Sequence, residues 1–151
     1  MSQIALAACA LVACLAFGSS VEVRAASDLQ VVNIMLQDQS TDPAIKGMVL
    51  KSDTTHVKAG RVSFQAVNAS KSLVHEVVVV PAASAGKDLP YNAKREAVDE
   101  KQAHAIGEVG DLKPGARGKV TLTLKPGNYL LICNQPGHYH AGMSTALAVD
   151  K

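Results

Sequence analysis

The sequence predicts an all-β domain, in which seven or eight antiparallel strands form a sandwich of two sheets. Short stretches alternate apolar and polar residues with a period of two, as expected for strands that bury one face. Turn signals that contain Gly or Pro separate these stretches. The 151 residues contain no internal repeat or low-complexity segment, and residues 26–151 alone are enough for one domain with a sizeable core.

The alternation is clearest in residues 61–67. Val62, Phe64 and Ala66 are expected to face the interior, while the polar residues between them face solvent. This pattern predicts a half-buried strand. The same alternation occurs in residues 119–124 and 145–149, and turn signals lie at residues 58–60, 113–115 and 125–127.

Two stretches depart from this alternation. Residues 74–80 are apolar at both odd and even positions, which favours a central strand. Residues 82–110 carry most of the charge density, and one or two exposed helical turns could follow an N-cap at Asn92, within residues 92–105. Because the apolar spacing in that part is poor, we expect a surface insertion between strands.

The amino-terminal residues 1–25 have the pattern of a secretory signal peptide. Residues 4–17 are nearly all apolar, and small residues follow them before a predicted cleavage site at Ala26. The mature domain is therefore expected to span residues 26–151, in the periplasm and without a membrane-spanning segment. A retained membrane anchor remains an alternative, because the first three residues lack Lys and Arg. Lipidation at Cys14 is another, because Leu11-Val12-Ala13-Cys14 looks like a lipoprotein signal.

Cys133 is the only cysteine that would remain after cleavage, because Cys9 and Cys14 leave with the signal peptide. A lone thiol in an oxidising compartment is expected to be occupied, and a bound metal would occupy it. The simpler alternative is a buried cysteine that acts as a small apolar residue. The net charge of +2 is spread without a basic run, which argues against nucleic acid and favours a protein partner with an acidic or neutral surface.

Three possible metal ligands follow the apolar stretch 129–132 within eleven residues: Cys133, His138 and Met143. A thiolate and a thioether are soft ligands, which select copper over harder cations. Two histidines and one cysteine, with a weakly bound axial methionine, form the ligand set of blue copper sites. His75, at the head of an apolar strand, is the candidate for the second histidine.

With these residues in view, residues 29–150 resemble the cupredoxins. The resemblance rests on the spacing of Cys133, His138 and Met143, on His75 downstream of Asn68-Ala69-Ser70, and on the glycine-bearing segment Lys125-Pro126-Gly127-Asn128-Tyr129 before the cysteine. It implies a Greek-key β-sandwich with one copper per chain, cycling between Cu(II) and Cu(I). It also implies His75, Cys133 and His138 as equatorial ligands and Met143 as the axial one.

Other residues leave alternatives open. His140 rivals His138 as a ligand, although its spacing from the cysteine is too long for the familiar loops. Many electron-carrying members of the family have Asn where Glu76 follows the first histidine. Asn68 is either a link between the two ligand loops or an ordinary turn residue. His56 and His104 are expected on the surface, and Met35 and Met48 in the core.

The resemblance implies a one-electron carrier that shuttles between periplasmic redox proteins, such as a cytochrome or an oxidase. We expect a monomer that is not an enzyme by itself. The alternative is a copper-binding protein for tolerance, storage or delivery, which Glu76 and His140 motivate. A copper enzyme would need a second copper, and His56, His104 and His140 do not form a ligand set for one.

Overall fold

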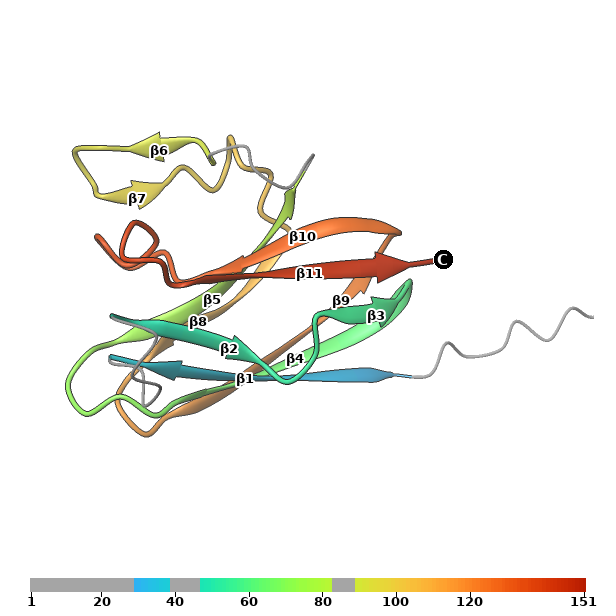
Figure 1. Ribbon diagram of the computed structural model, residues 1–151, viewed down its shortest axis with the longest axis horizontal. Coiled ribbons are helices and arrows are strands. Elements are labelled where there is room, and N and C mark those ends of the chain that lie inside the picture. Colours follow the sequence, from blue (N-terminus) through green and yellow to red (C-terminus); the bar gives the residue numbers. More distant parts are fainter. Residues whose placement is uncertain (1–28, 39–46, 83–88) are drawn as a thin grey trace, which may run out of the picture.

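The computed structural model describes residues 29–38, 47–82 and 89–151. The predicted signal peptide lies outside these ranges. Within them the chain forms eleven strands and no helix, so the all-β prediction is confirmed (Figure 1). The same ranges therefore contain no helix that could cross a membrane.

Two sheets form the layers of the sandwich, and a small third sheet lies beside one of them (Figure 1). In spatial order, the first contains β2 (Val49–Ser52), β1 (Gln30–Gln37), β4 (Gly60–Asn68) and β9 (Arg117–Leu124). The second contains β3 (His56–Lys58), β11 (Ser144–Asp150), β10 (Gly127–Ile132), β5 (His75–Ala82) and β8 (Gly107–Leu112). The third pairs β6 (Tyr91–Asn92) with β7 (Ala97–Val98).

The sheets are mixed, which corrects the expectation of purely antiparallel strands. After β2, the chain crosses to the second sheet and forms β3. It then returns to the first sheet as β4, on the side of β1 opposite β2, and β4 runs parallel to β1. β3 likewise lies parallel to β11. The two layers together contain nine strands, more than the seven or eight expected, because β2 and β3 are short edge strands that the sequence pattern did not reveal.

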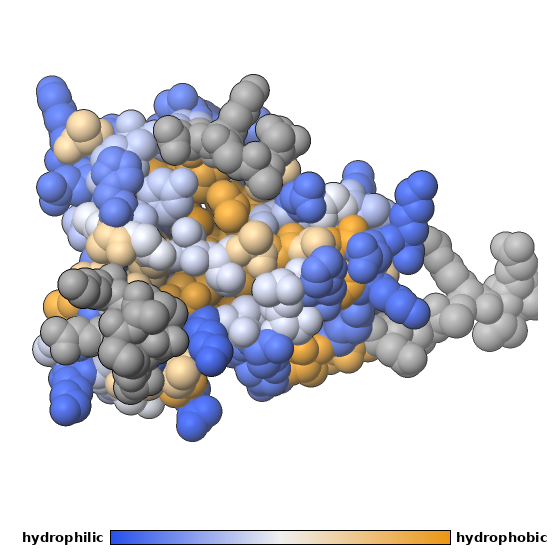
Figure 2. All heavy atoms as spheres, in the orientation of Figure 1, coloured by the Kyte–Doolittle hydropathy of each residue, from blue (hydrophilic) through white to orange (hydrophobic). Residues whose placement is uncertain are grey.

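The main core lies between the two layers, and apolar residues are visible along the middle of the face in Figure 2. Val62, Phe64 and Ala66 of β4 are buried, as their alternation predicted. They share this core with Val77 and Val79 from the opposite sheet. The period-two pattern therefore identified the inner face of β4 correctly.

β5 is a central strand, between β10 and β8, and it is buried on both faces. Val78 and Val80 point away from the main core and pack in a second cluster with Val98, Ala103 and Ile132. The insertion after β5 supplies two of these residues and so covers the outer face of the strand. This second cluster explains why the strand is apolar at both odd and even positions.

The described part of the insertion contains the β6–β7 hairpin and turns rather than helical turns. Asn92 does cap a turn, because its Oδ1 accepts hydrogen bonds from the backbone N–H groups of Lys94 and Arg95. Glu96 then adopts a left-handed backbone conformation, with φ of 51°, which does not continue a helix. The hairpin projects over the end of the sandwich where the β10–β11 loop lies (Figure 1).

Candidate metal centre

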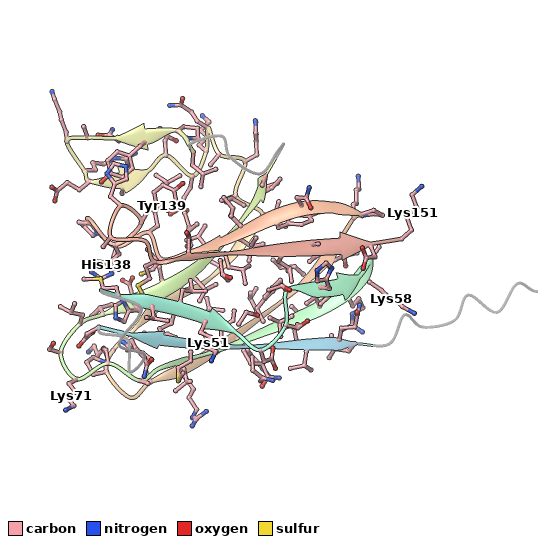
Figure 3. The ribbon with its side chains drawn as sticks, in the orientation of Figure 1. Lys51, Lys58, Lys71, His138, Tyr139 and Lys151 are labelled. Carbon is pink, nitrogen blue, oxygen red and sulfur yellow. The ribbon has the colours of Figure 1, made fainter. Side chains whose placement is uncertain are left out.

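Three predicted ligand atoms converge at this end of the sandwich. His75 Nδ1 lies 3.2 Å from His138 Nδ1 and 3.6 Å from Cys133 Sγ. Cys133 Sγ lies 3.4 Å from His138 Nδ1, which closes a triangle. Figure 3 shows His138 beside sulfur atoms at the end of the layers. The structure thus brings together residues that are up to 63 positions apart in the sequence.

Strand ends and one hydrogen-bonded loop position the candidate ligands. His75 is the first residue of β5, and Cys133 directly follows β10. The loop from Cys133 to β11 folds back on itself: the Cys133 N–H donates to the Met143 carbonyl at 3.0 Å, and the Met143 N–H donates to the His138 carbonyl at 3.1 Å. Gly137 turns the loop with φ of 81°, a conformation that glycine adopts easily.

All four predicted residues are buried at one place. His75, Cys133 and Met143 are fully inaccessible to solvent, whereas His138 is 9% exposed. The loop hydrogen bonds bring the Met143 backbone directly beside Cys133 and His138. The arrangement excludes water from the cluster except at the edge of His138.

The donor set and its size fit one metal ion. The centre of a triangle with these sides is about 2 Å from each corner, close to the ~2.0–2.3 Å bonds that nitrogen and thiolate ligands form with zinc-sized ions. Two imidazoles, a thiolate and a nearby thioether are the ligands that favour copper in a type 1 site. A hard cation such as Mg²⁺ would find no oxygen donor among them.

Burial sets the protonation of the ligands in the copper-free protein. Desolvation, with the nearby negative charges of Glu76 and Asp111, raises the pKa of Cys133 to about 11, despite backbone hydrogen bonds to the sulfur. Desolvation also lowers the pKa of His138, and the neighbouring His75 lowers it further. His138 is therefore ready to bind a metal as a neutral ligand, whereas Cys133 must lose a proton when it binds one.

Asp38 is a neighbour of the cluster that sequence reasoning missed. Its Oδ1 lies 3.1 Å from Nε2 of His75, the ring nitrogen opposite the one in the cluster. Desolvation raises the pKa of Asp38, but the hydrogen bonds that it accepts from His75, Lys71 and Ser72 together outweigh this effect, so the pKa is lowered. An aspartate at the end of a strand is a common surface residue, and the sequence pattern did not predict the strand that precedes Asp38, so nothing in the sequence linked it to His75.

Two asparagines secure the loops around the cluster. Asn68 donates to the carbonyls of Leu73 and Leu112 at 2.8 and 2.7 Å, and so holds the turn before His75. These bonds link that turn to β8 and not to the Cys133 loop. Asn134 secures the Cys133 loop instead, through two hydrogen bonds to the backbone of Val98 at 2.7 and 3.1 Å.

Glu76, the departure from the family pattern, lies 9% exposed beside His75. Burial, together with the negative charges of Asp111, Glu100 and Glu108, raises its pKa to about 7, and a hydrogen bond with Gln135 only partly offsets this. A protonated carboxyl is a donor as well as an acceptor, so Glu76 can imitate the amide of an asparagine at low pH. At higher pH it adds a negative charge next to the cluster.

This raised pKa makes the stability of the copper-free protein depend on pH. Between the ordinary pKa of 4.5 and the folded value of about 7, the folded chain binds more protons than the unfolded chain. The free energy of unfolding should therefore fall as the pH rises through this range, by about 3 kcal/mol for the full pKa difference. In urea unfolding of the copper-free protein, Glu76→Gln should remove most of this fall.

The exposed Glu108→Gln is a suitable control, because it removes a charge near Glu76 but leaves the buried carboxyl in place. It should reduce the fall only slightly. Equal pH dependence in Glu76→Gln and in the unaltered protein would show that Glu76 is ionised normally.

His140 lies outside the cluster, on the exposed side of the loop. Its ring stacks on Tyr91 of the insertion, with the ring centroids 3.7 Å apart. His56 and His104 are exposed, as expected. Met48 packs against the main core, whereas Met35 is only half-buried and lines a groove on the outer face of the first sheet.

Solved structures of known proteins share this architecture. No family model matches the sequence, and no curated protein matches it either. Rusticyanin from Thiobacillus ferrooxidans superposes with a TM-score of 0.57 and 17% identity, over 80% of this chain and 78% of its own. Auracyanin A from Chloroflexus aurantiacus, a "blue" copper protein, superposes with a TM-score of 0.52 and 23% identity, over 80% of this chain and 99% of its own. Auracyanin B superposes with a TM-score of 0.56 and 25% identity, over 81% of this chain and 89% of its own.

Auracyanin A is described as a "blue" copper protein and rusticyanin as a copper protein, and all three structures superpose over most of this chain. The Greek-key β-sandwich predicted from the resemblance is thereby confirmed. The protein therefore belongs with the cupredoxins in fold, and its cluster fits a single type 1 copper ion.

Proposed function

We propose that the protein carries one electron at a time between larger redox proteins and is not itself an enzyme. The observation that carries this proposal is the buried cluster, in which three ligand atoms lie within 3.6 Å of one another on two strand ends and one hydrogen-bonded loop. A copper bound there would supply the one-electron chemistry, as Cu(II) and Cu(I). Ligands held this firmly need to move little when the charge changes, which suits rapid electron transfer.

The proposed ligand roles follow from the donor atoms. His75 Nδ1, His138 Nδ1 and Cys133 Sγ form the triangle and would be the equatorial ligands. Met143 would be the axial ligand, because it is fully buried and its backbone is hydrogen-bonded to Cys133 and His138. A weak axial thioether beside a His₂Cys plane is the arrangement of blue copper sites.

The proposed route for the electron is the edge of His138, which is the only one of the four residues with any exposed surface. A cytochrome or an oxidase could dock on this end of the sandwich. The net charge of +2 favours a partner with an acidic or neutral surface. We expect the carrier to work as a monomer.

A second candidate function is copper tolerance, storage or delivery. The observation that favours it is the pair of carboxylates, Asp38 and Glu76, beside the histidine ligand. Negative charge near the site stabilises Cu(II) relative to Cu(I), which lowers the reduction potential. A low potential would make the protein a poor acceptor of electrons from many donors.

Electron exchange and metal exchange distinguish the two functions, because a carrier keeps its copper through many redox cycles and a delivery protein releases it. We expect the reduced protein to be reoxidised rapidly by a periplasmic cytochrome or oxidase, and to retain copper against a Cu(I) chelator. Stopped-flow absorbance would measure the first property and chelator competition the second. Slow electron exchange together with ready loss of Cu(I) would favour the delivery function.

We also propose that the protein acts in the periplasm after removal of residues 1–25. The apolar stretch 4–17 and the small residues before Ala26 support export. Mass spectrometry of the exported protein should show a chain that begins at or next to Ala26. An acylated Cys14 at the amino terminus would instead indicate a lipoprotein.

A further inference from the structure

The contact between Asp38 and His75 gives the histidine a defined orientation. Asp38 Oδ1 lies 3.1 Å from His75 Nε2, while His75 Nδ1 faces His138 and Cys133 at 3.2 and 3.6 Å. The ring is fully buried, so no water competes for either nitrogen. One nitrogen of His75 thus belongs to the metal cluster and the other to the carboxylate.

A neutral imidazole has one N–H donor and one nitrogen lone pair. A carboxylate can only accept, so Asp38 keeps the proton of His75 on Nε2. The lone pair is then on Nδ1, the atom that faces Cys133 and His138. Asp38 therefore selects the tautomer of His75 that can bind a metal at this place.

Asp38 is itself held by the turn that precedes His75. Its Oδ2 accepts hydrogen bonds from the backbone N–H groups of Lys71 and Ser72, at 3.2 and 3.3 Å, and from the Ser72 hydroxyl at 3.1 Å. Asn68 holds the same turn through its hydrogen bond to the Leu73 carbonyl. The carboxylate side chain is 21% exposed, so it is largely screened from solvent. Each oxygen of Asp38 consequently has its own set of donors.

We propose that Asp38 is a positioning residue for the metal ligand His75, which selects its ligating tautomer and favours Cu(II) over Cu(I) through its charge. This inference rests on the proposed function, because it assumes that His75 binds copper. It adds a residue from the end of β1 to a site that otherwise comes from β5 and the β10–β11 loop. The hydrogen bond and the charge of Asp38 can be tested separately.

Asparagine is not a conservative replacement at this position. The two backbone N–H groups of Lys71 and Ser72 need an oxygen at the Oδ2 place, so the amide oxygen of Asp38→Asn should take that place. Its NH₂ group would then face His75 Nε2 and require a lone pair there. The proton of His75 would move to Nδ1, the nitrogen needed for the metal.

The first test uses the copper-free protein, so it does not depend on metal binding. NMR of ¹⁵N-labelled histidine rings shows which nitrogen of His75 carries the proton, and the chain has only five histidines to assign. We expect Nε2–H in the unaltered protein, Nδ1–H in Asp38→Asn and a mixture in Asp38→Ala. Asp150→Asn, which removes a charge at the far end of β11, should retain Nε2–H.

The second test measures copper affinity by competition with chelators in each oxidation state. Loss of a residue that orients a metal ligand typically weakens binding by about 10- to 100-fold. We expect Asp38→Ala to lose Cu(II) affinity by this factor, and Asp38→Asn to lose more. In both variants the affinity for Cu(I) should fall less than the affinity for Cu(II). Ser72→Ala, which keeps the carboxylate and removes one of its donors, should have a small effect.

The two tests separate this inference from the proposed function. Blue copper binding with an unchanged His75 tautomer and an unchanged ratio of Cu(II) to Cu(I) affinity in both Asp38 variants would overturn the role of Asp38 and leave the carrier intact. An Nε2–H tautomer that depends on Asp38, in a protein that binds no copper, would support the hydrogen bond and refute the copper site. An Nδ1–H tautomer in the unaltered protein would refute the inference directly.

Discussion

Cys133→Ser should abolish the intense visible colour of the copper-loaded protein. The colour of a blue copper site comes from charge transfer between the thiolate and Cu(II), and a serine hydroxyl cannot supply it. Cys133 is fully buried, with its sulfur 3.4 and 3.6 Å from the two histidine nitrogens, so no other thiol can take its place among the described residues. Absorption spectra of protein loaded with one equivalent of Cu(II) would measure the effect.

Cys133→Ala is the matched control for folding, because it removes the sulfur without leaving a buried hydroxyl. Cys133→Ser should unfold at lower urea concentration than Cys133→Ala if the hydroxyl finds no hydrogen-bond partner, at a cost of about 1–3 kcal/mol. Both variants should be colourless. Blue colour in either one would refute the assignment of Cys133 as a ligand.

His138→Ala should open a coordination position, whereas His140→Ala should leave the copper spectrum largely intact. His138 Nδ1 belongs to the triangle with His75 and Cys133. His140 stacks on Tyr91 outside it, and loss of the stacked pair costs about 0.5–1.5 kcal/mol of stability. Added imidazole should therefore bind the copper of His138→Ala and change the absorption spectrum of the copper-loaded variant. Titration with imidazole, followed by absorbance, would measure this change.

His140→Ala serves as the control for this experiment, because it removes an imidazole two residues away in the same loop. It should bind copper with the original colour and show no response to added imidazole. The opposite pattern in the two variants would reassign the ligand to His140. A response in both would mean that the loop rearranges when either ring is lost.

The sequence predicted the parts of the fold that depend on local pattern. The alternation in residues 61–67 identified the inner face of β4, and the apolar residues 77–80 identified a strand buried on both sides. The short strands β2 and β3 and the β6–β7 hairpin were missed, because two to four residues are too few for a periodic pattern. Their pairing depends on neighbours that are distant in the sequence.

The sequence by itself determined the ligand types and the compact loop that carries three of them, Cys133, His138 and Met143, because these residues are close together in the chain. Only the tertiary structure decided what surrounds them. Asp38 reaches His75 across 37 residues, and Asn134 reaches Val98 across 36. Hydrogen bonds of this kind depend on how strands from different parts of the chain are placed by the packing of the two layers. The three candidate ligands of the loop are thus local information, whereas the approach of His75 and the hydrogen bonds that support the cluster are properties of the fold.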